Sequence, residues 1–161
     1  MDPNFTIRPA APDEMAAVAR LFRDYAGALG VDLGFQGFEA ELAGLPGTYA
    51  PPAGALLVAI SPDGDAVGCV AVRKLHEDGT CEMKRLHVAP VVRKAGIGRA
   101  LAVSAIEAAF RSGYQAMRLD TLPGMEAAQA LYRSLGFETT PPYYETPVSG
   151  TIFMRRVLAG P

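Results

Sequence analysis

The segment from residue 81 to residue 120 constrains the fold most, because a strand, a loop with glycines, a helix and a second strand follow one another there. The first strand covers residues 81–88 and ends before a proline. Helical spacing of apolar residues predicts a helix over 97–113, and 117–119 begin the next strand. A helix between two strands joins them as a right-handed crossover, so we expect parallel neighbours in one sheet.

Short turns connect the other predicted strands. Strands at residues 56–60 and 67–75 flank a turn with the sequence SPDGD, and a second turn at 76–79 leads into the strand at 81–88. An opening strand precedes them, and a hairpin closes the chain. The pattern predicts a mixed, mostly antiparallel sheet.

Helices should flank this sheet. Pro12 and the acids that follow it start the first helix, and residues 27–37 are rich in glycine and predict a loop. A short helix then covers 38–42, and a last helix covers 125–135. The class is therefore α/β, of the α+β type, and 161 residues suit a single domain, which we expect to span 1–161.

The strand at residues 81–88 does not alternate regularly between apolar and polar residues. A β-bulge near Lys84 and Arg85 restores the alternation. Apolar side chains then face the core, and Glu82 and His87 lie together on the opposite, open face.

Composition excludes several classes of protein. Half the residues are hydrophobic and the net charge is −2, which argues against disorder and against general attraction for nucleic acid. Apolar stretches such as 54–60 are shorter than the ~20 residues of a membrane helix. Residues 1–10 lack the basic and apolar pattern of a secretory signal. We expect a cytoplasmic protein with no membrane partner.

Cys69 and Cys81, with His76 and His87, do not form a predicted metal site or disulfide. Hairpin pairing places Cys81 opposite about Lys74, so that Cys69 lies roughly 16 Å along the sheet, beyond disulfide reach. Both cysteines should be free thiols, as in a reducing compartment.

Charge is distributed unevenly along the chain. Residues 1–79 contain 5 basic and 11 acidic side chains (−6), whereas 80–161 contain 10 and 6 (+4). Basic residues cluster between 84 and 99, around Gly96 and Gly98. This cluster indicates either an anionic ligand or a solvated basic face.

Gly96 and Gly98 precede a helix, where free N–H groups and the helix dipole bind anions. A Walker loop is excluded because no Gly-Lys-Ser/Thr sequence follows. A dinucleotide motif would need glycine at Leu101, although Asp120 lies at a suitable distance downstream. A purely structural helix start is the remaining alternative.

A third motif includes Arg93 and the two glycines. The segments CEMKRLHV, VRKAGIGRAL, MRLDT and ALYRSLGF occur in an order and spacing that resemble the GNAT superfamily of acetyl-CoA-dependent N-acetyltransferases. The resemblance is clear over residues 55–140. It implies the GNAT acyl-CoA N-acyltransferase fold and transfer of an acetyl group from acetyl-CoA, as cosubstrate and without a metal, to an amine.

The resemblance also implies the residues that contact CoA. The glycine loop would hold the pyrophosphate on its backbone N–H groups, and the preceding strand would bind the pantetheine arm. Met125 stands where the family often has an asparagine that contacts pantetheine. The implied residues are Leu86, His87, Val88, Arg93, Lys94, Ala95, Gly96, Ile97, Gly98, Arg99, Met125 and Tyr132.

Three residues are candidates for catalysis. Tyr132 matches the family tyrosine beside the CoA sulfur, and Glu82 or His87 could take the proton of the amine. Each has a simpler interpretation: Tyr132 packs on an aromatic neighbour, Glu82 pairs with a basic residue, and His87 lines a cleft. The acceptor amine, with Tyr143 and Tyr144 among its candidate contacts, is not specified, and whether the chain forms a homodimer stays open. A non-catalytic acetyl-CoA sensor on the same fold is the alternative function.

Overall fold

The computed structural model describes residues 1–93 and 95–158. The strands are β1 (Thr6–Pro9), β2 (Ala55–Ile60), β3 (Ala66–Lys74), β4 (Thr80–Val88), β5 (Ala116–Thr121), β6 (Glu138–Thr140) and β7 (Ile152–Val157). The α-helices are α1 (Met15–Leu29), α2 (Phe38–Ala43), α3 (Ile97–Arg111) and α4 (Glu126–Ser134). Short 3-10 turns are η1 (Pro12–Glu14), η2 (Leu33–Gln36), η3 (Gly47–Tyr49) and η4 (Pro90–Val92).

The strands form one seven-stranded sheet in the order β1-β2-β3-β4-β5-β7-β6. β4 and β5 are parallel, and the other neighbours are antiparallel, which confirms the predicted crossover and the mixed sheet. The closing hairpin is β6 and β7, as predicted. The sequence did not indicate that β7 would enter the sheet between β5 and β6.

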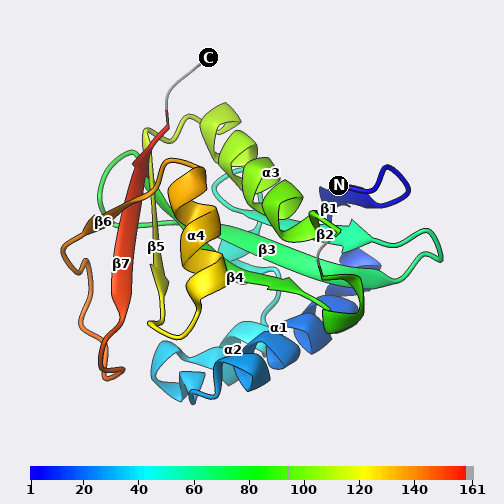
Figure 1. The fold of residues 1–161 in the computed structure, drawn as a ribbon, viewed down its shortest axis with the longest axis horizontal. Coiled ribbons are helices and arrows are strands. Elements are labelled where there is room, and N and C mark those ends of the chain that lie inside the picture. The colour runs from blue at the N-terminus through cyan, green and yellow to red at the C-terminus, as the bar shows by residue number, and fades with distance from the viewer. Residues whose placement is uncertain (94, 159–161) are drawn as a thin grey trace.

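Apolar clusters cover both faces of the sheet. One cluster joins the sheet to α3 and α4 through residues such as Leu101 and Phe137. The other joins it to α1 and α2 through Phe22 and Leu42. Figure 1 shows α3 and α4 in front of the sheet and α1 and α2 along its lower side. The two layers enclose the point where β4 meets β5.

The first helix is longer than the sequence indicated. α1 continues through Gly27, predicted as the start of the loop, to Leu29, and ends at Gly30 in the left-handed conformation. Gly27 is exposed, and no atom lies within 4 Å of the position a Cβ would take there, so the glycine leaves no packing gap. Its cost to the helix is therefore only the lower helix propensity of glycine.

The predicted bulge in β4 is confirmed. β3 pairs Cys69 with His87 and Ala71 with Lys84, so that β4 has one additional residue between these pairs. Arg85 lies in this interval with φ of 62°, a value that side chains other than glycine rarely adopt. The bulge shifts the side chains that follow it by one position.

β4 and β5 separate soon after they begin. Their pairing runs only from Thr80 opposite Ala116 to Glu82 opposite Arg118. In Figure 1, β4 runs across the view, whereas β5 runs down it, and α4 lies in front of the region where they diverge. Beyond Glu82, the edge of β4 that faces β5 therefore has no strand partner.

The two cysteines are free and buried, and burial raises the pKa of Cys69 and raises that of Cys81 to about 12. Lys74 pairs with Cys81, as the hairpin register predicted. We therefore predict that a thiol reagent labels neither cysteine rapidly in the native protein and labels both after denaturation without reductant. Rapid labelling of the folded protein, followed by mass spectrometry, would contradict this burial.

Candidate active site

Two adjoining pockets occupy the region between the diverging strands. The inner pocket is lined by Tyr25, Met83, Lys84, Arg85, Leu86, Asp120 and Tyr132. The outer pocket is lined by Tyr25, Leu29, Val31, Leu33, Gln36, Arg85, Asp120, Thr121, Leu122, Met125, Tyr144, Thr146, Val148 and Thr151. Tyr25, Arg85 and Asp120 line both pockets. A ligand in the outer pocket therefore lies next to a ligand group bound in the inner pocket.

Arg85 forms part of the wall between α1, α2 and the pockets. It is 3% exposed, and its Nε and Nη2 donate to the two carboxylate oxygens of Glu41 at 3.0 and 2.8 Å. Nη2 also donates to Gln36 Oε1 at 3.0 Å. The guanidinium lies over the rings of Tyr25 and Phe38, 5.7 and 5.3 Å from their centroids. These contacts hold the bulge in place.

Glu82 lies on the predicted face, but that face is covered rather than open. The side chain is 1% exposed, and Arg73 Nε donates to its Oε1 at 2.7 Å. The Tyr143 hydroxyl donates to Oε2, and Lys84 Nζ lies 3.9 Å from Oε1. The predicted carboxylate is therefore enclosed by an ion pair with Arg73, opposite it in the β3–β4 hairpin, and by Tyr143, which is 61 residues away in the sequence.

His87 also lies on this face and is covered by α1. It is 7% exposed and its ring meets the Tyr25 ring edge to face, with centroids 6.5 Å apart. Burial and the nearby Arg93 lower its pKa, which favours the neutral imidazole. His87 lines neither the inner nor the outer pocket.

Tyr132 reaches the inner pocket from α4. The residue is 8% exposed, and its ring packs against Phe137 with centroids 5.9 Å apart. Within residues 1–93 and 95–158, no hydrogen bond to its hydroxyl is found. Burial raises its pKa, so the phenol stays protonated and can donate a hydrogen bond into the pocket.

Asp120 is a site residue that the sequence did not identify as such, whereas its partner Tyr144 was a predicted candidate contact of the acceptor and does line the outer pocket. Tyr144 Oη donates to Asp120 Oδ2 at 2.7 Å, and burial together with this carboxylate raises the pKa of Tyr144. In the sequence, Asp120 fits a dinucleotide motif only by its distance downstream of the glycine loop. The antiparallel pairing of β3 with β4 is incompatible with that fold, so the dinucleotide alternative is wrong. The sequence signal that could have identified Asp120 is its position near the end of β5, the second strand of the crossover.

The glycine loop leads into α3 with free backbone donors. Gly96 is the N-cap with φ of 77°, and the first bond of the helix runs from Ala100 N to Gly96 O. The N–H groups of Ile97, Gly98 and Arg99 precede that bond and thus lack partners within the helix. A Cβ built at Gly98 meets only Val88 Cγ2, at 3.7 Å, so the backbone is open to a close ligand.

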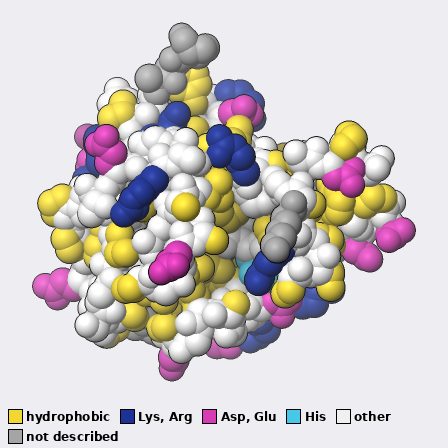
Figure 2. Space-filling model, viewed as in Figure 1, with side chains coloured by type: hydrophobic (Ala, Val, Ile, Leu, Met, Phe, Trp, Pro, Cys, Tyr) yellow, Lys and Arg dark blue, Asp and Glu magenta, His cyan; other side chains and the backbone are white. Residues whose placement is uncertain are grey.

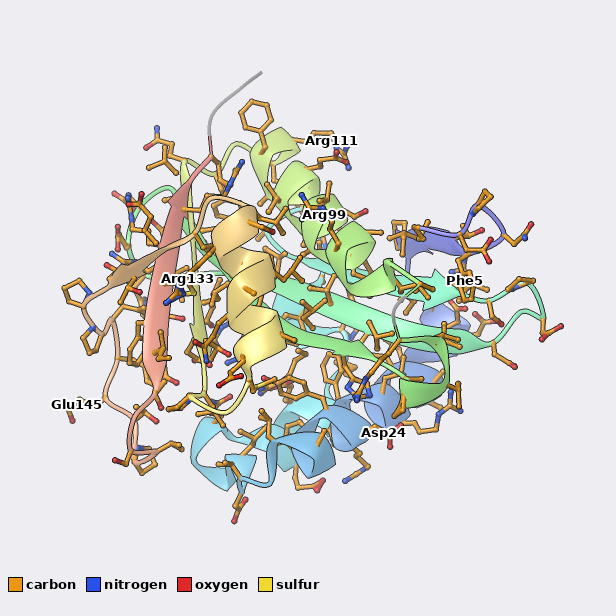
Figure 3. The ribbon with its side chains drawn as sticks, viewed as in Figure 1. Phe5, Asp24, Arg99, Arg111, Arg133 and Glu145 are labelled. Carbon is orange, nitrogen blue, oxygen red and sulfur yellow. The ribbon has the colours of Figure 1, made fainter. Side chains whose placement is uncertain are left out.

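The basic residues of this region have different partners. Arg99 Nη1 donates to Ser134 Oγ at 2.9 Å and joins α3 to α4, on the side shown in Figure 3. Arg93 Nε donates to the Val88 carbonyl at 3.2 Å. Figure 2 shows other Lys and Arg side chains spread over this same face. Lys84 and Arg85 are buried instead, so they do not belong to a solvated basic face. Lys94 lies outside the described residues.

The strand and helix residues implied for CoA lie in the pockets or against the α3 layer. Leu86 lines the inner pocket, and Val88 and Ala95 pack partly buried against the α3 layer. Met125 is the N-cap of α4 and lines the outer pocket. Among the described residues, no cluster of three or more metal-ligating side chains occurs, and none of the helices is long and apolar enough to cross a membrane.

Known proteins share this sequence and architecture. An uncharacterized N-acetyltransferase of Schizosaccharomyces pombe is 41% identical over 144 residues, which cover 89% of this chain and 88% of that protein. A GNAT-family acetyltransferase of Staphylococcus aureus has the same fold with a TM-score of 0.81 at 18% identity, over 96% of this chain and 99% of that one.

An acetyltransferase of Salmonella typhimurium, solved with its cofactor acetyl-CoA, aligns with a TM-score of 0.73 at 23% identity, over 97% of this chain and 95% of that one. A model of the acetyltransferase (GNAT) family matches residues 16–137. That segment contains the diverging strands, the glycine loop and the tyrosine of α4. The chain belongs to the acetyltransferase (GNAT) family.

Proposed function

We propose that this protein is an N-acetyltransferase that moves an acetyl group from acetyl-CoA directly to an amine, and that residues 1–161 form a single domain for this reaction. The observation that carries the proposal is the juxtaposition of three features. The unpaired edge of β4 lies beside the free N–H groups that begin α3, and Tyr132 presents a hydroxyl between β4 and β5.

The backbone is suited to hold acetyl-CoA as a substrate. The N–H groups of Ile97, Gly98 and Arg99 bind the pyrophosphate, helped by the positive end of the α3 dipole. The amides of pantetheine extend the sheet along residues 86–88 of β4, as a peptide does at an open sheet edge. Arg93 and Arg99, with Lys94, supply positive charge nearby. The solved Salmonella structure with acetyl-CoA supports this choice of cosubstrate.

Tyr132 assists the departure of sulfur by donating a hydrogen bond. Reference pKa values of about 10 for tyrosine and 8.5 for a thiol make complete proton transfer to the thiolate uphill by ~2 kcal/mol. Burial raises the pKa of Tyr132 further. A retained hydrogen bond to the developing thiolate is therefore more favourable than transfer, and β4 N–H groups stabilise the oxyanion at the acetyl carbon.

The amine must lose a proton before it attacks. A lysine-type amine at pH 7 requires about 4.6 kcal/mol for this step. Glu82 and His87 are the sequence-based candidates for the base. Glu82 would act through its partners, since Arg73 and Tyr143 occupy both of its oxygens. His87 would be available as a neutral imidazole.

The decisive experiment measures thiol release from acetyl-CoA over a panel of alkylamines, amino acids, peptide amino termini and lysine peptides. We expect amine-dependent thiol release, with the acetylated amine identified by mass spectrometry. If acetyl-CoA binds but none of the amines causes thiol release, the result would instead support the non-catalytic sensor.

We predict that Gly98→Val abolishes stabilisation by acetyl-CoA. The wild-type protein should gain about 2.7 kcal/mol of unfolding free energy at a ligand concentration 100 times Kd. A Cβ alone fits at residue 98, so the valine need not disturb the fold. Its two methyl groups would occupy the space that the pyrophosphate needs beside the loop backbone.

Gly27→Val is the matched control, because it lies in α1 with no atom within 4 Å of a new Cβ. Gly96 is less suitable, since its positive φ makes any substitution strained. The same ligand-induced shift in Tm for Gly98→Val and Gly27→Val would contradict the assignment of the loop.

We also predict that Tyr132→Phe keeps the fold and the affinity for acetyl-CoA, because the ring and its packing on Phe137 remain. Turnover should fall about 10²-fold, as expected when one donor to a developing anion is removed. The measurement is kcat at saturating amine, with a pre-steady-state experiment to establish that chemistry limits the rate. Wild-type kcat under those conditions would show that Tyr132 only packs.

A further inference from the structure

We infer that Asp120 binds the ammonium group of the acceptor beside the thioester and takes up its proton, and that the acceptor is a primary amine on an apolar body. This inference rests on the proposed function and names its base and substrate class. Asp120 is the acidic residue that lines both the inner and the outer pocket of the described chain. It therefore stands between Tyr132 and the space open to an acceptor.

The carboxylate of Asp120 is available, unlike that of Glu82. Among the described residues, Asp120 makes no ion pair within 4 Å, and its recorded side-chain partner is Tyr144, which binds Oδ2. Its Oδ1 is left for a ligand, and the residue is only partly buried. Glu82 has Arg73 and Tyr143 on its two oxygens and is almost fully buried.

The other polar groups of the outer pocket are largely occupied by protein. Gln36 Oε1 accepts from Lys84 and Arg85. Thr146 Oγ1 accepts from Val148 N, and Thr151 Oγ1 donates to Val148 O. Thr121 Oγ1 is buried without a partner among the described residues and can bind a polar atom of the ligand. Besides Asp120, the hydroxyl groups of Tyr25 and Thr121 are the polar groups of this pocket that remain for a ligand, and neither carries a charge.

Apolar side chains form part of the remaining wall. They come from the end of α1, from the segment that leads into η2, from the loop between β5 and α4 and from the loop before β7: Leu29, Val31, Leu33, Leu122, Met125 and Val148. Such walls bind a hydrocarbon body, whereas a carboxylate positioned among them selects a cation at one end. A short alkylammonium or arylalkylammonium ion has this distribution.

The cationic side chains near Asp120 are directed to other partners, so they leave its carboxylate to a bound ammonium ion. Arg85 is paired with Glu41, and Lys84 is directed to Gln36, with a pKa lowered by burial. Burial raises the pKa of the nearby tyrosines, which stay neutral. The titratable groups around Asp120 are thus two cations, Lys84 and Arg85, and four neutral tyrosines, Tyr25, Tyr132, Tyr143 and Tyr144.

Acetyl transfer from sulfur to nitrogen removes two protons from the ammonium group. The ammonium nitrogen gives one proton to Asp120 Oδ1, and its freed electron pair forms the C–N bond to the acetyl carbon. The C–S bond breaks, and its electron pair leaves with sulfur. The second proton of the nitrogen passes to the sulfur to give the CoA thiol, and Asp120 returns the first proton to solvent.

The test compares Asp120→Asn with wild type, using n-butylamine and phenethylamine as acceptors. Asparagine keeps an acceptor oxygen for Tyr144 but lacks the charge and the basicity. We expect unchanged acetyl-CoA binding by calorimetry, and a fall of about 10²-fold in kcat/KM for both amines. Binding of n-butylammonium to the CoA complex should weaken at least about tenfold, since a charge-assisted bond is lost. Methoxyamine, which is neutral at pH 7, should be affected less.

Asp63→Asn, in the exposed turn between β2 and β3, is the control for loss of one negative charge. Equal kinetics for Asp120→Asn and Asp63→Asn, or a larger loss in Glu82→Gln than in Asp120→Asn at preserved acetyl-CoA binding, would overturn the inference. So would wild-type acetylation of other panel amines but of neither alkylamine. Thiol release with no amine at all would overturn the proposed function instead.

Discussion

The separation of β5 from β4 is the constraint on which the site depends. Parallel pairing ends at Glu82 and Arg118, so the remaining backbone of β4 keeps an unpaired edge inside the molecule. Such an edge needs partners for its N–H and C=O groups, because buried groups without them are costly. A ligand with amides can supply them. The bulge at Arg85 lies at the start of this edge, so sheet geometry and ligand binding are specified together.

The bulge at Arg85 is energetically unfavourable by itself, and contacts from α1 and α2 stabilise it. A side chain in the left-handed region costs about 1–3 kcal/mol, and burial of a guanidinium adds a further penalty. Two hydrogen bonds to Glu41 and the rings of Tyr25 and Phe38 offset these costs. α1 and α2 therefore do more than cover an apolar face of the sheet. They hold the strand conformation that opens the site.

Local patterns predicted the crossover, the bulge, the hairpin register and the glycine loop, because each depends on neighbours close in sequence. Pairing of Glu82 with a basic residue was one of the two sequence-based interpretations, and Arg73 provides that partner, but local patterns could not predict that Tyr143 would cover Glu82 or that Tyr25 would cover His87. Arg85 and Glu41 are 44 residues apart, and Tyr143 and Glu82 are 61 apart. Whether a carboxylate is exposed or enclosed depends on such distant partners. The sequence therefore placed Glu82 on the correct face but could not distinguish its environment from that of Asp120.

Two carboxylates on neighbouring strands illustrate how environment separates similar groups. Tyr143 and Tyr144 are adjacent, and each donates to one carboxylate, Glu82 and Asp120 respectively. Only Glu82 also receives a guanidinium, because Arg73 lies opposite it on β3, whereas Phe153 lies opposite Asp120 on β7. Strand pairing thus decides which carboxylate is neutralised. Asp120, opposite the apolar Phe153, remains able to bind a cation, in the manner of enzyme sites whose paired acids take different roles.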